Sequence, residues 1–275
     1  VRISTIGGNV AACAGGLRAV KYGVTGRYVL GLEVVTPTGD IVQFGGKLIK
    51  DVTGYNMVQL MVGSEGTLGI FTRIWLRLTP EPRESVDLLC FFSSVHEAIG
   101  LVPRVMAETG IVPTAMEFID GESFLRSCTY LNETLALDGA GAALIITVDG
   151  SDVDEVTRQY ESIGTLCEEH NALEVFVADN AADSERIWKV RRSIAEAYAR
   201  ISPHQTNEDL VVPPAAIPDL ISGMNEIAHR YGVFVPAYGH AGDGNIHTRI
   251  VKNPDWSMDE WDSKRPDILE DLYLL

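Results

Sequence analysis

Two histidines flank a glycine-rich reversal near the C-terminal end of the sequence. Residues 238–247 read Tyr-Gly-His-Ala-Gly-Asp-Gly-Asn-Ile-His. Asp-Gly is a strong signal for a two-residue hairpin turn, because a type I′ turn needs positive φ at both central positions. A turn at Asp243-Gly244 predicts that His240 lies directly opposite His247, with Cβ atoms about 5 Å apart. Two imidazoles at that separation can bind one metal ion, although zinc needs further ligands.

The alternative is a glycine-rich turn that carries two incidental histidines. The whole chain has six histidines, so two at mirror positions about one turn favour a metal-binding or catalytic pair.

Three glycine groups near the N-terminal end could approach a ligand closely. They are Gly7-Gly8, Gly15-Gly16, and the loop that contains Gly63, Gly66 and Gly69. Glycine lets the backbone approach a ligand, and successive N–H groups can bind phosphate. None of the groups is a Walker loop or a Rossmann fingerprint. Each could be an ordinary turn, but three within about 70 residues favour a ligand cradle.

Composition excludes several classes of function. The net charge of −16 argues against nucleic acid and anionic membranes as partners, but not against a small anionic substrate. The cysteines, at positions 13, 90, 128 and 167, form no Cys-x-x-Cys, so neither an iron–sulfur cluster nor a cysteine zinc site is encoded. No apolar run approaches the length of a membrane span, and we expect no signal peptide.

The pattern of apolar residues and breakers predicts two domains. In residues 1–82 we expect a tight turn at 5–9, a short helix at 10–14, a hairpin of 28–36 with 41–44, a short helix at 56–62 and a strand at 70–78. Pro80 and Pro82 then mark a boundary. Residues 83–275 alternate helices and strands, which predicts an α+β domain with helices over one face of a sheet.

The glycine motifs also carry a resemblance. Thr5-Ile6-Gly7-Gly8-Asn9 with Ala14-Gly15-Gly16, and then Gly63-Ser64-Glu65-Gly66-Thr67-Leu68-Gly69-Ile70, resemble the FAD-binding domain of FAD-linked oxidases of the vanillyl-alcohol oxidase type. The histidine hairpin resembles the signature of the 2-hydroxyacid branch of that family. The likeness covers nearly the whole chain and is closest to glycolate oxidase flavin subunits and D-lactate dehydrogenases.

This resemblance implies a fold. Residues 1–82 would be the second part of the FAD-binding domain, without its preceding pyrophosphate-binding part. Residues 83–275 would be the substrate or cap domain, ferredoxin-like and truncated at its C-terminus. We therefore expect residues 1–275 alone to be inactive and not to bind FAD tightly.

The resemblance also implies site residues for the cofactor. The residues that would contact FAD are Thr5, Gly7, Gly8, Asn9 and Gly15 along the flavin, and Glu65, Gly69 and Ile70 near its nucleotide half. Cys13 departs from the family pattern, since relatives often have Asn there.

In the 2-hydroxyacid branch, the histidines that match His240 and His247 bind a divalent metal, usually zinc. Their third ligand and the catalytic base lie in a later Gly-Glu-His-Gly motif that this sequence does not reach. Arg191 matches a substrate-binding arginine, with a solvated helix face as the alternative. Asn207 aligns loosely with a substrate lysine. The metal would ease loss of the hydroxyl proton as hydride leaves for flavin N5.

The resemblance therefore implies an FAD-dependent oxidoreductase that oxidises glycolate or a D-2-hydroxy acid, such as D-lactate, to the 2-oxo acid. The alternatives are a metal-free flavin alcohol oxidase of the same fold and a non-catalytic scaffold subunit. We expect a small-molecule substrate, an iron–sulfur subunit and a second flavin-type subunit as partners, and a cytoplasmic location that allows peripheral attachment to the inner membrane.

Overall fold

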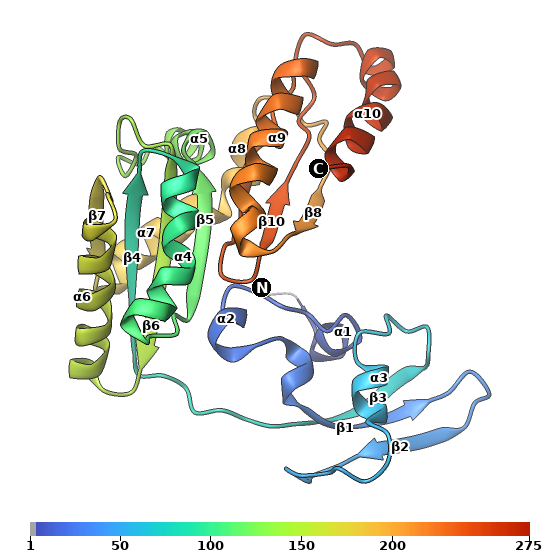
Figure 1. The fold of residues 1–275 in the computed structure, drawn as a ribbon. Helices are drawn as coiled ribbons and strands as arrows, with labels where there is room; N and C mark the ends of the chain where they lie inside the picture. Colours follow the sequence, from blue (N-terminus) through green and yellow to red (C-terminus); the bar gives the residue numbers. More distant parts are fainter. Residues whose placement is uncertain (1–3) are drawn as a thin grey trace. The chain divides into compact units, whose positions relative to one another are not determined.

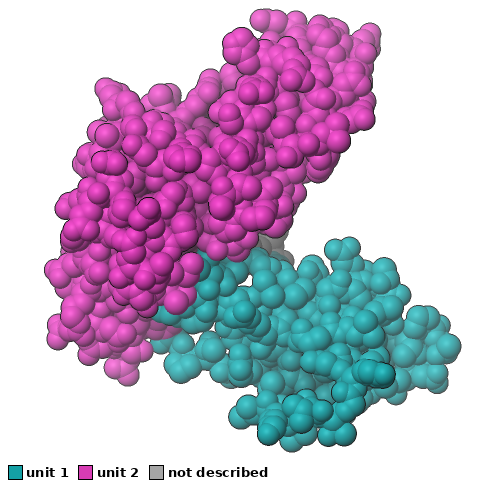
Figure 2. Space-filling model, in the orientation of Figure 1, with its two compact units in different colours: residues 1–81 teal, residues 82–275 magenta. Residues whose placement is uncertain are grey.

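The computed structural model describes residues 4–275. The chain divides into two compact units, of which the first ends at Glu81 and the second runs from Pro82 to Leu275 (Figures 1 and 2). Each unit has its own apolar core. None of the helices in the described residues combines the length and apolar composition that crossing a membrane requires.

The first unit is built on a three-stranded antiparallel sheet in the order β2-β1-β3. Its strands are β1 (Val29–Val35), β2 (Ile41–Gly45) and β3 (Ile70–Leu76). The predicted hairpin is therefore confirmed, because β1 pairs with β2 around the Pro37–Asp40 turn. Apolar side chains of β1, such as Leu32 and Val34, pack against the helices of the unit to form its core.

The helical segments of the first unit are short. They are α1 (Ile6–Ala11), α2 (Ala19–Tyr22), the 3₁₀ turn η1 (Thr25–Tyr28) and α3 (Met57–Met61). The predicted tight turn at residues 5–9 is wrong, because Gly7 and Gly8 lie in the first turn of α1. The Thr5 hydroxyl accepts a hydrogen bond from the Gly8 amide at 3.0 Å. Such capping starts a helix by satisfying a free N–H group.

The second unit begins with a ferredoxin-like arrangement. Its elements, in order, are β4 (Glu84–Phe92), α4 (Val95–Thr109), β5 (Ala115–Asp120), α5 (Gly121–Leu131), β6 (Ala142–Gly150), α6 (Val153–Glu169) and β7 (Glu174–Ala178). The four strands pair antiparallel in the order β7-β4-β6-β5. Helices α4 and α6 connect them, as in a split βαβ fold.

The rest of the chain extends this sheet from β5. The added elements are α7 (Ala181–Arg192), α8 (Ile194–Ala199), β8 (Glu208–Val211), η2 (Pro214–Ala216), α9 (Ile217–Tyr231), β9 (Ala237–His240), β10 (Asn245–Thr248) and α10 (Met258–Tyr273). The full order is β7-β4-β6-β5-β9-β10-β8. Because β9 pairs with β5, the histidine hairpin lies beside a strand that precedes it by more than 100 residues.

Helices cover both faces of the large sheet, so the expectation of one covered face is wrong. Leu88 and Cys90 of β4 belong to the core that includes α4, α6 and α9. Leu89 and Phe91 belong to a second core with α5, α7 and α8. The strand is buried at successive positions rather than at alternate ones. An unbroken apolar strand is the sequence signal for burial on both faces.

Candidate functional site

The histidine hairpin has a longer loop than the sequence predicts. Strand β9 pairs with β10 so that His240 lies opposite Asn245 and His247 lies opposite Tyr238. The predicted direct opposition of His240 and His247 is therefore wrong. Residues 241–244 form the loop, and only Gly244 of the Asp243-Gly244 pair has a positive φ, of 86°. A type I′ turn needs positive φ at both positions.

The two imidazoles nevertheless converge. His240 and His247 lie on the same face of the sheet as diagonal neighbours, within reach of each other. Their Nε2 atoms are 3.4 Å apart, and their ring centroids are 5.0 Å apart. Tetrahedral zinc with Zn–N bonds of 2.0–2.1 Å separates two nitrogen ligands by about 3.4 Å. The pair therefore fits two positions of a metal site.

A carboxylate holds the other nitrogen of each ring. The His240 Nδ1 hydrogen-bonds with Glu117, and the His247 Nδ1 hydrogen-bonds with Asp209. A carboxylate acceptor favours hydrogen on Nδ1, which leaves the Nε2 lone pair of a neutral imidazole free for a metal. Burial alone lowers the pKa of His240, but the hydrogen bond and charge of Glu117 outweigh it, and the pKa is raised.

Glu117 joins His240 to Arg191. Glu117 lies opposite His240 in the β5–β9 pair and is completely buried. Its Oε2 accepts a hydrogen bond from Arg191 Nε at 3.0 Å and forms an ion pair with Arg191 Nη2 at 2.7 Å. Arg191 is in the last turn of α7, is 7% exposed, and has its Cζ 4.7 Å from the ring centroid of Tyr238. The solvated helix face that the sequence allows for Arg191 is thus wrong.

The sequence alone did not point to Glu117 or Asp209. Glu117 is the single charged residue between Ala115 and Ile119. An acid in an otherwise apolar strand must be paired when it is buried, and this signal could have identified it. Asp209 gave no such signal, because it lies in a polar segment.

Asn207 lies outside the ion-paired cluster. It is exposed and immediately precedes β8. The register of the β8–β10 pair continues to the bridge between Gln205 and Val251. Asn207 therefore stands across from Arg249, one pair beyond Thr248.

In the described part of the chain, only His240 and His247 have free ring nitrogens placed to share one metal ion. Within residues 4–275, no group of three or more His, Cys, Asp or Glu side chains is arranged to hold a metal. Glu117 and Asp209 occupy the Nδ1 sides of the histidines. A metal between the Nε2 atoms would thus take its other ligands from another side chain type, a substrate, water or other parts of the protein.

The predicted cofactor segments lie together within the first unit. The Gly63 amide donates to the Val10 carbonyl at 3.1 Å, and the Glu65 amide donates to the Ala11 carbonyl at 2.9 Å. These bonds bring the loop before β3 onto the end of α1. Segments 5–15 and 63–70, which are far apart in the sequence, thus form one surface.

Gly69 has a packing role in addition to its predicted cofactor role. A Cβ atom added there would lie 2.7 Å from the Val35 carbonyl oxygen. The close approach of the loop to β1 therefore requires glycine. The neighbouring Ile70 is 69% exposed at the start of β3, so its side chain is free to contact a ligand.

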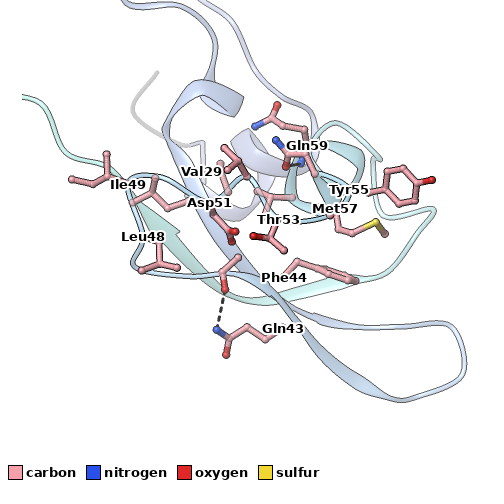
Figure 3. A pocket seen from close by; sticks show the side chains of 16 residues that line it. Val29, Gln43, Phe44, Leu48, Ile49, Asp51, Thr53, Tyr55, Met57 and Gln59 are labelled. Atoms are coloured by element: carbon pink, nitrogen blue, oxygen red, sulfur yellow. Dashed lines mark hydrogen bonds between the residues drawn. The ribbon is translucent and has the colours of Figure 1, made fainter.

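The first unit also has a hollow that the sequence did not predict. It measures about 520 Å³ and lies between strands β1 and β2 and residues 48–59 (Figure 3). Ile49 and Tyr55 on its rim are 88% and 93% exposed. None of the predicted cofactor residues lines it. A cluster of exposed apolar side chains is the usual mark of a contact surface.

Comparison with known families identifies the class of protein. Residues 81–265 match the family described as FAD linked oxidases, C-terminal domain, and residues 1–45 match the FAD binding domain. The first match covers more than half of the chain, so the chain belongs to the FAD-linked oxidases. FAD is the cofactor of this family, which confirms that part of the cofactor prediction.

Individual relatives narrow the resemblance to the predicted branch. The chain is 40% identical over 258 residues to the glycolate oxidase subunit GlcD of Bacillus subtilis (strain 168), covering 93% of this chain and 54% of that protein. It is 35% identical over 272 residues to a D-lactate dehydrogenase of Anaerostipes hadrus, covering 96% of this chain and 56% of that protein. The chain thus spans about half the length of these curated relatives.

Solved structures support the fold class. An alkyldihydroxyacetonephosphate synthase aligns over 98% of this chain and 53% of its own, with a TM-score of 0.71 and 19% identity. A p-cresol methylhydroxylase aligns over 96% of this chain and 59% of its own, with a TM-score of 0.70 and 15% identity. At this identity the likeness concerns the fold alone. The predicted vanillyl-alcohol-oxidase-type α+β fold is confirmed.

Proposed function

We propose that this chain is part of an FAD-dependent oxidoreductase that converts glycolate or a D-2-hydroxy acid such as D-lactate to the 2-oxo acid. The observation that carries the proposal is the pair of imidazoles whose Nε2 atoms lie 3.4 Å apart in a chain of the FAD-linked oxidase family. The names of the relatives, glycolate oxidase subunit and D-lactate dehydrogenase, support the substrate class.

The proposed division of labour follows the two domains. Residues 1–82, the second part of the FAD-binding domain, would contact the cofactor through Thr5, Gly7, Gly8, Asn9, Gly15, Glu65, Gly69 and Ile70. Residues 83–275, the cap domain, would bind the substrate. The contact between α1 and the 63–69 loop supports this proposed set of FAD contacts. FAD, when bound, accepts the hydride.

His240 and His247 would hold a divalent metal, which we take to be zinc, through their Nε2 atoms. Such an ion polarises a substrate hydroxyl and lowers the cost of removing its proton. The chain's own contribution is orientation. Glu117 and Asp209 hold Nδ1 of the two rings, which keeps both Nε2 atoms directed at one point.

A substrate carboxylate needs a cation near this point. The sequence suggests Arg191 and Asn207 as its ligands. Arg191 brings a guanidinium to the cluster, although two of its nitrogens bind Glu117.

Anaerobic reduction of the flavin tests the proposed reaction. We expect the absorbance of the FAD-loaded full-length protein to bleach on addition of glycolate or D-lactate, and not on addition of L-lactate. An FAD-loaded protein that no 2-hydroxy acid reduces would contradict the proposal. A full-length protein that cannot be loaded with FAD would support the scaffold alternative.

Replacement of either histidine tests the metal. We expect His240→Ala and His247→Ala each to lose the bound metal, measured by elemental analysis, while the flavin absorbance shows that FAD stays bound. Turnover should fall in both variants. Unchanged turnover would favour a metal-free flavin alcohol oxidase of the same fold.

We also propose a multi-subunit setting in the cytoplasm, with an iron–sulfur subunit and a second flavin-type subunit as partners. Support for the multi-subunit setting comes from the relative named as a glycolate oxidase subunit. Affinity purification of the tagged protein from its own cells, followed by mass spectrometry, should recover an iron–sulfur protein. Recovery of the tagged chain alone would contradict this setting.

A further inference from the structure

Arg249 is a partly buried cation with neutral partners. It follows β10, and its Nε is 3.3 Å from the Tyr238 hydroxyl. Its Nη1 is 3.5 Å from Oε1 of Gln205. Arg249 forms no ion pair with an acidic side chain anywhere in residues 4–275. A guanidinium that is half removed from water without a counter-ion is a favourable place for an anion.

The strand register places Arg249 next to the histidine pair. Arg249 is two residues after His247 and so lies about 7 Å further along the same face of the strand. Tyr238 connects the two positions. It pairs with His247, its ring centroid is 5.9 Å from that imidazole, and its hydroxyl contacts Arg249.

The flanking strands bring no charge to Arg249. The β9–β10 and β8–β10 registers continue past the ends of these strands. In them, Pro236 lies opposite Arg249 on one side and Asn207 lies opposite it on the other. The nearby acids are occupied elsewhere, because Glu117 binds Arg191 and His240, and Asp209 binds His247. The positive charge of Arg249 is therefore not neutralised by the surrounding side chains.

Arg191 differs from Arg249 in this respect. Its charge is matched by the fully buried Glu117, and only 7% of its surface is exposed. Removing Arg191 from that pair to bind a substrate would leave a buried carboxylate without its cation, which is costly.

We propose that Arg249 binds the carboxylate of the substrate, and that Arg191 is a positioning residue that acts through Glu117. This inference rests on the proposed function and assigns the residue that recognises the carboxylate of its small 2-hydroxy acid substrate. In such molecules the hydroxyl and the carboxylate are on adjacent carbons. When the substrate hydroxyl lies at the histidine pair, the carboxylate is thus within reach of the long side chain of Arg249, two residues after His247. The guanidinium can bind both carboxylate oxygens.

The test compares a hydroxy acid with its neutral amide. The FAD-loaded full-length enzyme is assayed with D-lactate and D-lactamide, or with glycolate and glycolamide, and the ratio of the two kcat/KM values is measured. This ratio does not depend on the fraction of active enzyme. We expect Arg249→Gln to lower the acid-to-amide ratio roughly ten- to a hundredfold, the effect of losing a charge-assisted hydrogen bond. Arg249→Lys, which keeps the charge, should recover part of it.

Two further variants separate the proposed role of Arg249 from that of Arg191. Arg191→Gln should lower turnover of acid and amide alike and reduce metal content, with the ratio unchanged. Arg104→Gln, on the exposed surface of α4 where Arg104 pairs with Glu108, should match the wild type. An unchanged ratio in Arg249→Gln, or a larger fall in Arg191→Gln, would overturn the inference. Failure of the proposed function looks different, since the wild type would then oxidise neither acid nor amide.

Discussion

Glu117 is the residue on which the candidate site depends most. One carboxylate oxygen binds the His240 ring and the other binds Arg191, and no part of Glu117 is exposed. A buried charge that serves two partners cannot be replaced by a neutral group without leaving one of them unmatched. Orientation of the ring and stability of the sheet are thus coupled at one side chain.

We expect Glu117→Gln to weaken the site in two ways. The free energy of unfolding should fall by about 3 kcal/mol, because the Arg191 guanidinium is left buried without a counter-ion. Metal affinity should fall by roughly ten- to a hundredfold, the usual cost of losing a carboxylate behind a histidine ligand. Urea denaturation and zinc titration of the purified protein measure the two effects.

Glu133→Gln is the matched control for this change. Glu133 also pairs with an arginine, Arg186, but the two side chains are 19% and 40% exposed. Water screens such a pair, so the loss should stay below about 1 kcal/mol, with no effect on zinc. Equal losses in the two variants would show that Arg191 is not held by the buried charge of Glu117.

Thr5 has a structural role besides its predicted contact with FAD. Its hydroxyl caps α1 by accepting from the Gly8 amide. Thr5→Ala should therefore lower the stability of the first unit by about 1 kcal/mol even without FAD, and Thr5→Ser should restore it. Thermal unfolding of the FAD-free protein measures this. Equal stability of all three proteins would leave Thr5 only its cofactor role.

At the scale of single residues, the sequence predicts the histidines but not their carboxylates. His240 and His247 stand out because they flank one glycine-rich turn. Glu117 precedes His240 by 123 residues, and only the pairing of β5 with β9 brings them together. Local patterns carry no information about that pairing. Arg191 could be proposed from a resemblance, but its ion pair with Glu117 depends on how α7 packs on the sheet.

The hairpin shows how an incorrect turn can still give a correct site. The sequence predicts that His240 lies opposite His247, whereas the structure pairs His247 with Tyr238. Side chains alternate between the faces of a strand, so a shift by two positions returns both histidines to the same face. The sequence spacing of the two histidines was therefore enough to predict that they share one face of the sheet. The register depends on the four-residue loop, whose conformation Asp243-Gly244 does not determine.

Gly244 should be essential to that loop. Its φ is 86°, and an added Cβ would lie 2.0 Å from the Val212 carbonyl oxygen. We expect Gly244→Ala to cost more than about 2 kcal/mol of unfolding free energy and to weaken zinc binding, because the backbone must move and β10 carries His247. Urea denaturation and zinc titration measure both effects.

Gly139→Ala is the control that separates the cost of the steric clash at position 244 from the cost of a positive φ. Gly139 has a similar φ of 82°, but no atom lies within 4 Å of an added Cβ. Its loss should be about 1 kcal/mol, the cost of a left-handed alanine alone. If the two alanine variants lose the same stability, the contact with Val212 does not constrain the hairpin loop.

For the whole molecule, the sequence indicates two units and the boundary between them. It does not indicate how many strands the sheet of the second unit contains. The strand pattern predicts the hairpin of the first unit, and the family resemblance implies the ferredoxin-like start of the second. It does not reveal that β9, β10 and β8 continue the same sheet from β5. That continuation depends on a free strand edge meeting a distant hairpin. It is also what brings Glu117, His240, His247 and Asp209 into one row of neighbouring strands.

Because this row lies within one unit, the proposed metal site should be separable from the proposed cofactor site. Glu117, Arg191, Asp209 and both histidines all belong to Pro82–Leu275, which has two apolar cores of its own. We therefore expect residues 82–275, expressed alone, to unfold cooperatively. They should bind zinc within about threefold of the affinity of residues 1–275, because a factor of three is well under 1 kcal/mol. Residues 82–275 with His240→Ala supply the control. Loss of zinc binding in the shorter chain, with its fold intact by circular dichroism, would mean that the first unit contributes to the metal site.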